Sequence, residues 1–542
     1  MTMTTSAALA SIADGFHITD NQYKAIVEGF KAECNMGLNT PLASSDQPTI
    51  MIPSYVTRMP KGDETGTFLS LDLGGSNLRV SAVELLGQGQ VQVAEVKRIV
   101  TDDLRTGAID SFFDWMADAV HELLLQQHMT QLSATEPLAM GVCWSFPVDQ
   151  TSIIHGKILR MGKGFTLEGI EGQDLAGLFH QAFARKGLNI VVTALVNDTV
   201  GTLVAHAYSH PGACIGFIYG TGVNASYPEK ISRIGKLHVG NGSITSNLSE
   251  QHAEQEQQQN DAIMLINTEI DLFGNESYLP LTPFDKALDQ QHSQPNFQAY
   301  EKMMSGAYLG ELARLVIVSL TIEHKALFGG HLPSQWKEPW TLTTTWMSEM
   351  ESMQNNEQRL TKFNEWIAAE TSDNPTTTAT SEDMEQLMQV CTMISTRAAT
   401  LASAAIAAII EQQGLLGNEE GSDNNDPIII GVNGSTFEKY PQMQQRIYSK
   451  LRSWFGDEVA ARIQLDLAKD GSSIGGALIA MLYHPSMQSP KIDNQDNAYV
   501  SCLPPWVIRR LSKMSFLQRP FFKKLVFRNK SHNAITKKEK SA

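Results

Sequence analysis

The sequence is short of positive charge. Among 542 residues, 42 Lys and Arg stand against 58 Asp and Glu, so the formal net charge is −16. Proteins that bind nucleic-acid backbones need a basic surface, because neutralised phosphates supply much of the affinity. The deficit therefore argues against nucleic acid as a general partner. The apolar fraction of 42% is ordinary for a soluble globular protein, and the length exceeds one typical domain, so we expect two lobes.

Cysteine is also scarce, and its spacing is irregular. The chain has five, at Cys34, Cys143, Cys214, Cys391 and Cys502, and no two form a CxxC pair. This usage fits a reducing compartment and argues against a disulfide framework or structural zinc.

Long apolar segments are missing as well. Residues 1–12 are small and polar with no Lys or Arg, unlike a signal peptide. The longest apolar run, residues 398–410, is too short to span a bilayer and contains Thr400 and Ser403. We therefore expect a soluble cytoplasmic protein.

Three glycine-rich turns follow apolar runs. Residues 68–80 read as a strand, the turn Gly74-Gly75-Ser76-Asn77 and a second strand, with Asp72 at the end of the first. Residues 215–227 repeat this arrangement, and residues 427–436 end an apolar run in Gly434 and Ser435. Glycine leaves backbone amides open to a polyanion. One such turn is commonly an ordinary hairpin, but three suggest a single ligand held from several sides.

Helical and strand patterns alternate around these turns. Helical spacing occupies residues 111–127, 174–186 and 200–208, and strands are expected at 138–146 and 190–196. Helices are also expected at residues 19–30, 295–320 and 383–413. This order predicts a layered α/β fold. No GxxxxGK[ST] loop occurs, so the chain is not a P-loop kinase.

Two segments look peripheral. Residues 241–259 are polar and rich in Gln, which is typical of a surface insertion. Residues 509–540 carry eleven Lys or Arg against the single acid Glu539, with Phe interleaved. The tail could contact an anionic membrane or a partner protein, but a disordered solvated tail is the simpler interpretation.

Several of these motifs together resemble the hexokinase family in order and spacing. They are residues 68–80, Trp144-Ser145-Phe146-Pro147, Gly162-Lys163-Gly164-Phe165, residues 197–202, Gly220-Thr221-Gly222-Val223-Asn224 and Asn267-Thr268-Glu269. The resemblance covers residues 15–485. It implies the actin-like ATPase (ribonuclease H-like) fold, with two α/β lobes flanking a catalytic cleft, and ATP-dependent phosphorylation of the 6-hydroxyl of a glucose-type hexose entering glycolysis.

The resemblance also assigns roles to residues. It implies that Asp198 takes the proton of the sugar hydroxyl and that Lys163 offsets charge on the transferring group. It places Asp72 at Mg²⁺ through water. The implied sugar-binding residues are Ser145, Gly162, Lys163, Asn197, Asp198, Asn224, Glu269 and Glu301. The implied nucleotide-binding residues are Asp72, Gly74, Gly75, Ser76, Asn77, Arg79, Thr221, Gly434 and Ser435. Without the order of the motifs, each of these residues would be interpreted as a helix cap, a turn residue or a surface residue.

Four positions depart from the family pattern. Ser76 replaces Thr, Gly162 replaces a Thr that would donate to the sugar, Asn433 replaces Asp, and residues 270–272 replace an aromatic-Gly-Ala segment. Gly162, with Trp144 and Leu272-Phe273-Gly274, is also similar to fungal N-acetylglucosamine kinases. An N-acetylglucosamine kinase is therefore an alternative, and a non-catalytic hexokinase-like sugar sensor is another.

The expected organisation has five parts. Residues 1–66 form an N-terminal helix and lead-in that pack on the large lobe. Residues 67–208 form the small lobe, residues 209–466 the large lobe, residues 467–500 a helix that returns to the small lobe, and residues 501–542 the tail. The sequence does not decide between a monomer and a homodimer. It also leaves the sugar preference and any feedback inhibition undecided.

Overall fold

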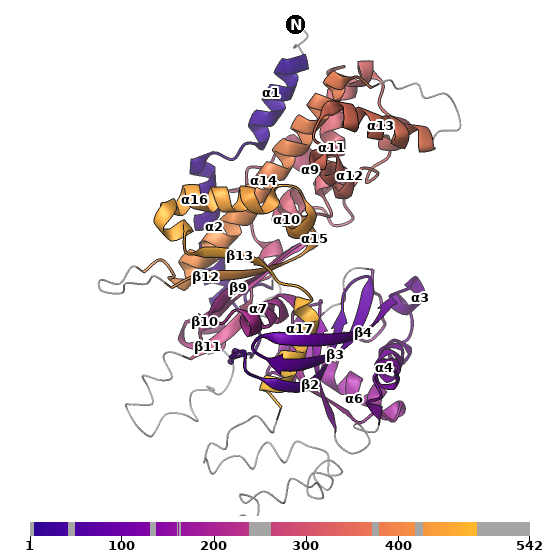
Figure 1. Cartoon of the computed structure of the whole chain (residues 1–542), viewed down its shortest axis with the longest axis vertical. Coiled ribbons are helices and arrows are strands. Elements are labelled where there is room, and N and C mark those ends of the chain that lie inside the picture. The colour runs from indigo at the N-terminus through magenta and orange to yellow at the C-terminus, as the bar shows by residue number, and fades with distance from the viewer. Residues whose placement is uncertain are drawn as a thin grey trace, which may run out of the picture. The chain divides into compact units, whose positions relative to one another are not determined.

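Figure 1 shows a computed structural model of the chain. It describes residues 5–41, 49–130, 137–159, 161, 164–237, 262–370, 379–417 and 426–484. The Gln-rich segment, the basic tail, Cys502, Gly162 and Lys163 lie outside the described residues.

Two β-sheets form the frame of this part of the chain, and they share one topology. The first has the order β4-β3-β2-β5-β8, with β2 to β4 antiparallel and β2, β5 and β8 parallel. The second has the order β1-β11-β10-β9-β12-β13, with β9 to β11 antiparallel and β9, β12 and β13 parallel. The bounds of the first sheet are β2 Thr65–Leu73, β3 Asn77–Gly87, β4 Gln90–Ile99, β5 Leu138–Trp144 and β8 Ile190–Val196. Those of the second are β1 Ile52–Pro53, β9 Ala213–Tyr219, β10 Val223–Lys230, β11 Ile263–Asn267, β12 Ile428–Asn433 and β13 Ile463–Leu467.

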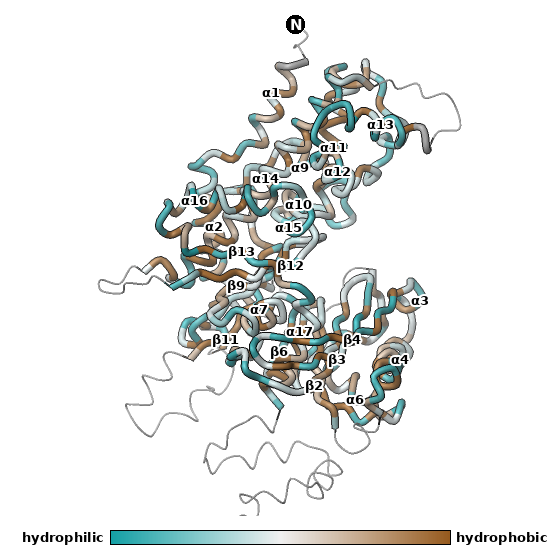
Figure 2. Tube along the Cα trace, in the orientation of Figure 1, coloured by the Kyte–Doolittle hydropathy of each residue, from teal (hydrophilic) through white to brown (hydrophobic). Residues whose placement is uncertain are grey.

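Each sheet has its own helical cover. Helices α4 (Ile109–Gln126) and α6 (Leu175–Arg185) share an apolar core with the first sheet. A larger core joins the second sheet to its helices, which are α1 Thr5–Phe16, α2 Asp20–Asn39, α9 Pro283–Gln291, α10 Ala299–Met304, α11 Leu309–Val318, α12 Thr344–Ser352, α13 Asn356–Glu370, α14 Ser381–Gln413, α15 Ser435–Lys439 and α16 Met443–Ala460. In Figure 2 the tube along β12, a strand of this core, is coloured hydrophobic.

Capping residues mark the starts of helices α2 and α14. Thr19 and Gln22 form a capping box at α2, and Thr380 and Asp383 form one at α14. Gly414 ends α14 in the left-handed conformation that glycine adopts without strain. Helix α14 is long and apolar enough to cross a membrane, but 83% of its most apolar window is buried inside the structure, as in the core helix of a globular protein.

Two helices lie between the sheets. Helix α7 (Asp198–Ser209) follows β8 and helix α17 (Gly471–Leu482) follows β13, and both share a core with residues of each sheet. Figure 1 shows α7 and α17 side by side at this position. Each helix therefore begins at the end of a strand and directs its N-terminus toward the same region.

The helical segment expected at residues 295–320 is interrupted. Helix α10 ends at Met304 and α11 begins at Leu309. Between them, the amides of Gly306 and Ala307 donate to the carbonyls of Gly220 and Thr221 at 2.8 and 3.0 Å. The break exists because this backbone docks on the β9–β10 turn instead of continuing the helix.

Candidate active site

The β2–β3 turn is held in place from several sides. The Gly74 amide donates to the Asn77 carbonyl at 3.0 Å, and the Val100 amide donates to the Ser76 carbonyl at 2.9 Å. The guanidinium of Arg105 donates to the Gly75 carbonyl at 3.0 Å. The turn therefore presents a fixed backbone, as the phosphate-binding prediction requires.

Asp72 stands beside this turn and faces α17. Its Oδ2 accepts a hydrogen bond from the hydroxyl of Ser472 at 2.7 Å, although the two residues lie 400 positions apart in the chain. Arg79, the other charged residue predicted here, is its cross-strand partner on β3. The end of β2 and the start of α17 thus meet at one point.

The electrostatics of Asp72 depend on its surroundings. The pKa of this carboxyl is raised to about 6, because burial and, to a smaller extent, the negative charge of Asp198 raise it more than Ser472 and Arg79 lower it. The influence of Asp198 means that the two carboxyl groups lie in the same region, as the predicted roles require. A partly buried carboxyl with a raised pKa is also typical of functional sites.

Glycines let the two inner helices approach closely. A Cβ on Gly475 would lie 2.0 Å from the carbonyl oxygen of Gly201, and one on Gly471 would lie 2.6 Å from the Thr202 hydroxyl. On the other side of α17, a Cβ on Gly141 of β5 would lie 2.0 Å from the Gly476 carbonyl oxygen. These contacts fix the N-termini of α7 and α17, which carry Asp198 and Ser472. Helix N-termini favour anions, because their amides and dipole point outward.

A hydrogen-bonded set of amide and carboxylate side chains lies next to Asp198. The Asn224 side-chain amide donates to Asn267 Oδ1 at 3.0 Å and to Glu269 Oε1 at 3.1 Å. Asn267 also donates to Glu269 Oε1 at 2.6 Å. Asn197 caps α7 by accepting from the Thr199 amide at 2.9 Å, and the Thr199 hydroxyl lies 3.4 Å from Asn267 Oδ1. The ends of β8, β10 and β11 thereby bring Asn197, Asn224 and Glu269 into one region.

Acidic groups extend this set away from α7. Glu301 Oε2 accepts from the Val223 amide at 3.0 Å. Behind it, Asp271 is buried and accepts from the Gln298 amide at 2.5 Å. Burial raises the pKa of Asp271 well above its ordinary value, and the charges of Glu269 and Glu301 raise it further. Asp271 was not predicted as a site residue, because its segment was identified only as a departure from the family pattern.

An open pocket adjoins this network. It is lined by Asn197, Asn267 and Glu269, with apolar walls that include Trp144 and Phe146. Ser145 stands between those two aromatic residues, and its amide donates to the Leu73 carbonyl at 3.2 Å. Small-molecule sites are typically lined by apolar side chains with a small number of polar groups among them.

The second predicted phosphate turn is tied to α15. The Thr436 hydroxyl donates to the Gly220 carbonyl at 2.8 Å. Gly434 precedes α15 with φ of 136°, and a Cβ there would lie 2.3 Å from the Tyr219 carbonyl oxygen. Thr221, Gly434 and Ser435 are therefore brought together, and only glycine fits at 434.

Two contacts in this region went unpredicted. Asn267 lies in the Asn267-Thr268-Glu269 motif and Ser472 in the segment expected to return to the small lobe, but the sequence assigned a role to neither. For Ser472 the only available signal was a hydroxyl in the first turn of a helix that follows Asp470-Gly471, and the contact with Asp72 depends on the tertiary fold. Gly162 and Lys163 lie outside the described residues, so their predicted roles stay predictions.

The donor set around Asp72 fits a magnesium ion. Carboxylate and hydroxyl oxygens are the hard ligands that Mg²⁺ takes, and it commonly uses one or two carboxylates with water. A cation here would offset the mutual repulsion of Asp72 and Asp198. Because Asp72 is held by Ser472, its carboxylate is already oriented.

Comparison with known proteins gives a consistent result. Two family models described as hexokinase match residues 8–208 and 214–482. Hexokinase-1 of Schizosaccharomyces pombe is 32% identical over 88% of this chain and 90% of its own length. Hexokinase-1 of Saccharomyces cerevisiae is 32% identical over 87% and 91%. The structure of a Schistosoma mansoni hexokinase complexed with glucose has a TM-score of 0.71 and 30% identity, and the match covers 88% of this chain and 99% of that one. The expected actin-like α/β fold is confirmed by this likeness.

Proposed function

The chain belongs to the hexokinase family and is a phosphotransferase with a sugar hydroxyl as acceptor, and we propose that it phosphorylates the 6-hydroxyl of glucose-type hexoses at the start of glycolysis. The observation that carries the proposal is the position of Asp198. It begins α7 directly after Asn197 and before Thr199, whose hydroxyl lies 3.4 Å from Asn267 Oδ1, and its charge raises the pKa of Asp72. A sugar held by the network would place a hydroxyl beside a carboxylate that faces the phosphate turn.

The proposed mechanism assigns one task to each group. Asn197, Asn224, Glu269 and Glu301 bind the sugar hydroxyls together with Ser145, and an analogue lacking a hydroxyl would leave these polar groups unpaired. Asp198 accepts the proton of the 6-hydroxyl as it attacks. Lys163 and Gly162 belong to the proposed site by sequence alone.

The proposed donor is ATP with Mg²⁺. Asp72 would hold the ion through water, with Ser472 fixing its carboxylate, and the ion would supply charge neutralisation at the phosphates. The backbone of residues 74–77 and Arg79 face the phosphates in this proposal, while Thr221, Gly434 and Ser435 contact the rest of the nucleotide.

Release of ADP in a coupled assay tests the function. We expect turnover with glucose, mannose or fructose, dependent on both ATP and Mg²⁺. N-acetylglucosamine belongs to the same panel, because it separates the alternative substrate from the proposed one. No turnover with any of the four sugars would overturn the kinase proposal and favour the non-catalytic sensor.

The N-acetylglucosamine branch finds no support among the matched relatives, which are named as hexokinases. Its main residue, Gly162, lies outside the described residues. Glucose-type hexoses therefore stand as the proposal.

The remaining expectations are also proposals. They are a cytoplasmic location, a monomer or homodimer, the five-part division of the chain, and a weak membrane or protein contact through residues 509–540. The gap between the two family matches, after residue 208, supports the proposed boundary between the lobes.

A further inference from the structure

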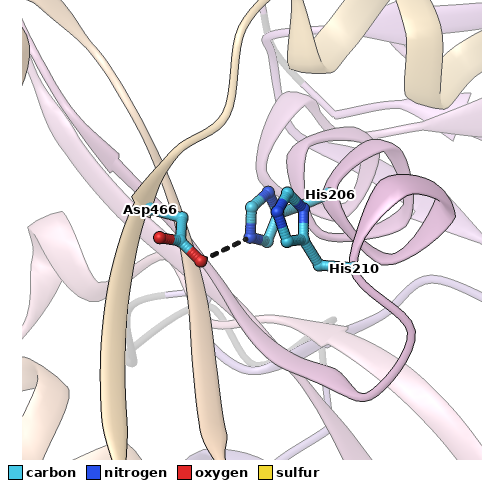
Figure 3. Close-up of side chains that lie close together, drawn as sticks. All are labelled: His206, His210 and Asp466. Carbon is cyan, nitrogen blue, oxygen red and sulfur yellow. Dashed lines mark ion pairs between the residues drawn. The ribbon is translucent and has the colours of Figure 1, made fainter. Parts of the chain in front are cut away.

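Three potential metal ligands lie at the end of α7 opposite to Asp198. His206 and His210 are four residues apart, on the last turn of α7 and just after it, and Asp466 lies on β13. One ligand atom of each lies within 4.8 Å of the others. Figure 3 shows the two imidazole rings stacked and Asp466 facing them from the strand. None of the three belongs to the active site described above.

The buried imidazole of His206 faces a carboxylate. Its side chain is 2% exposed, and Asp466 Oδ2 forms an ion pair with its Nε2 at 3.6 Å, marked by the dashed line in Figure 3. This distance is longer than a normal hydrogen bond. The two atoms therefore face each other at a spacing that leaves room for a shared cation.

The neighbouring backbone makes room for this ring. A Cβ on Gly431 of β12 would lie 2.6 Å from Cβ and Cγ of His206. The ring therefore occupies a space that only glycine leaves open, directly beside β13, whose Asp466 is the cross-strand neighbour of Gly431.

The second imidazole is exposed and held by its neighbour. Nδ1 of His210 lies 2.9 Å from the Ser209 hydroxyl. A histidine that ligates a metal through one ring nitrogen usually makes a hydrogen bond through the other, which fixes the ring. Nε2 of His210 is thus the atom left for a ligand, and the ring centroids of the two histidines are 4.3 Å apart.

We propose that His206, His210 and Asp466 bind a divalent metal ion of the zinc class. Two imidazoles and one carboxylate, with water as a fourth ligand, form a common zinc donor set. Zinc holds such atoms at about 2.0–2.2 Å, so a small rotation of the exposed His210 completes the site. Magnesium is excluded by the ligands, because it takes oxygen donors. The scarcity of cysteine argued against structural zinc, but this site contains no thiolate.

The ion would connect the C-terminal end of α7 to β13. Asp198 begins the same helix, more than two helical turns away. The site is therefore structural, and its occupancy fixes the helix that carries the proposed base without entering the chemistry.

Titration of metal-free protein with Zn²⁺ and with Co²⁺ tests the site. We expect calorimetry to show that wild type binds one Zn²⁺. Its melting temperature should rise when Zn²⁺ is bound. Bound Co²⁺ should show the visible absorption of a four-coordinate complex. His210→Ala and Asp466→Asn should each weaken binding at least about tenfold and abolish the shift in melting temperature. With Mg²⁺ and ATP supplied and zinc removed, sugar kinase activity of His210→Ala should equal that of wild type.

His121→Ala supplies the control, because His121 is an exposed histidine on α4. It should bind Zn²⁺ as wild type does. Equal affinity in wild type and His210→Ala would overturn the proposal, as would equal loss in His121→Ala or no binding by wild type.

Discussion

At the scale of single residues, the site depends on a carboxyl group whose ionisation is disfavoured. Burial and the nearby charge of Asp198 together raise the pKa of Asp72 to about 6. This arrangement therefore lowers the stability of the folded protein, as is common at functional sites. The Ser472 hydroxyl offsets part of that cost.

Asp72→Asn should stabilise the protein while reducing turnover. A carboxyl whose pKa is about 6 in the folded state, against an ordinary 3.8, disfavours folding when it is ionised. The gain in free energy of unfolding should be at most about 3 kcal/mol at pH 8. It should shrink as pH falls through 6 and vanish below about pH 4, where both states are protonated.

Urea unfolding of the metal-free protein across this pH range is the measurement, with Asp14→Asn on the exposed part of α1 as control. A gain that is the same at pH 4 and pH 8 would show that Asp72 is not held in an unfavourable ionised state.

At this scale the sequence identified the local segments that carry the proposed site residues and missed the contacts that the fold creates. Asp72, Asn197 and Glu269 each follow or end a strand, and a strand end beside a polar residue can be recognised locally. The contact between Ser472 and Asp72 joins residues 400 positions apart, so no local pattern contains it. Asp271 was visible only as a departure at 270–272, because its burial behind Glu269 and Glu301 depends on packing.

At the scale of elements, close packing of α7 and α17 positions both helix N-termini. Gly201, Gly471 and Gly475 remove the side chains that would separate the helices. The two helices were expected as segments of the chain, but their contact was not predicted. From sequence alone, a glycine within a helix indicates only a lower helix propensity.

Gly475→Ala should destabilise the protein and reduce activity together. The new Cβ would lie 2.0 Å from the Gly201 carbonyl oxygen, so the backbones must separate. Overpacking of this kind costs about 1–3 kcal/mol. Thermal unfolding and the coupled assay measure the two effects.

Gly15→Ala is the matched control, since its Cβ would meet only a methyl group at 3.9 Å. It should be neutral or stabilising, by up to about 1 kcal/mol. A Gly475→Ala protein with wild-type melting temperature and turnover would refute the role of the glycine contact.

A buried ion pair connects α14 to α9. The guanidinium of Arg397 donates to both carboxylate oxygens of Asp285 at 2.7 Å, and both residues are buried. Asp285→Asn would leave the buried cation unpaired, which typically costs about 3–5 kcal/mol. We expect a loss of that order in denaturant unfolding.

The exposed pair Arg452 and Asp457 offers the comparison, since side-chain exposures are 60% and 78%. Asp457→Asn should change stability by less than about 1 kcal/mol. Similar losses in Asp285→Asn and Asp457→Asn would contradict the structural role of the buried pair.

At the scale of the whole molecule, the two sheets repeat one topology. Alternation of strand and helix predicted the α/β class, whereas the repeated strand order was not recognised, because strand pairing is absent from a local pattern. The helical break between α10 and α11 was likewise missed, since docking on the β9–β10 turn is a long-range contact.

Sugar should draw the lobes together. The proposed ligands come from both, with Ser145 and Asn197 on the first and Asn224, Glu269 and Glu301 on the second, so bound sugar favours a closed arrangement. Small-angle scattering should show a smaller radius of gyration with saturating glucose and no change with sorbitol. An identical radius with and without glucose would exclude closure.

The central claim is that Asp198 is the base for a sugar hydroxyl, and turnover of Asp198→Asn tests it most directly. The coupled assay should show kcat lower by about 10²–10⁴-fold, with glucose affinity within a few-fold of wild type and Asp14→Asn unaffected. Glucose phosphorylation at the wild-type rate by folded Asp198→Asn would contradict the claim.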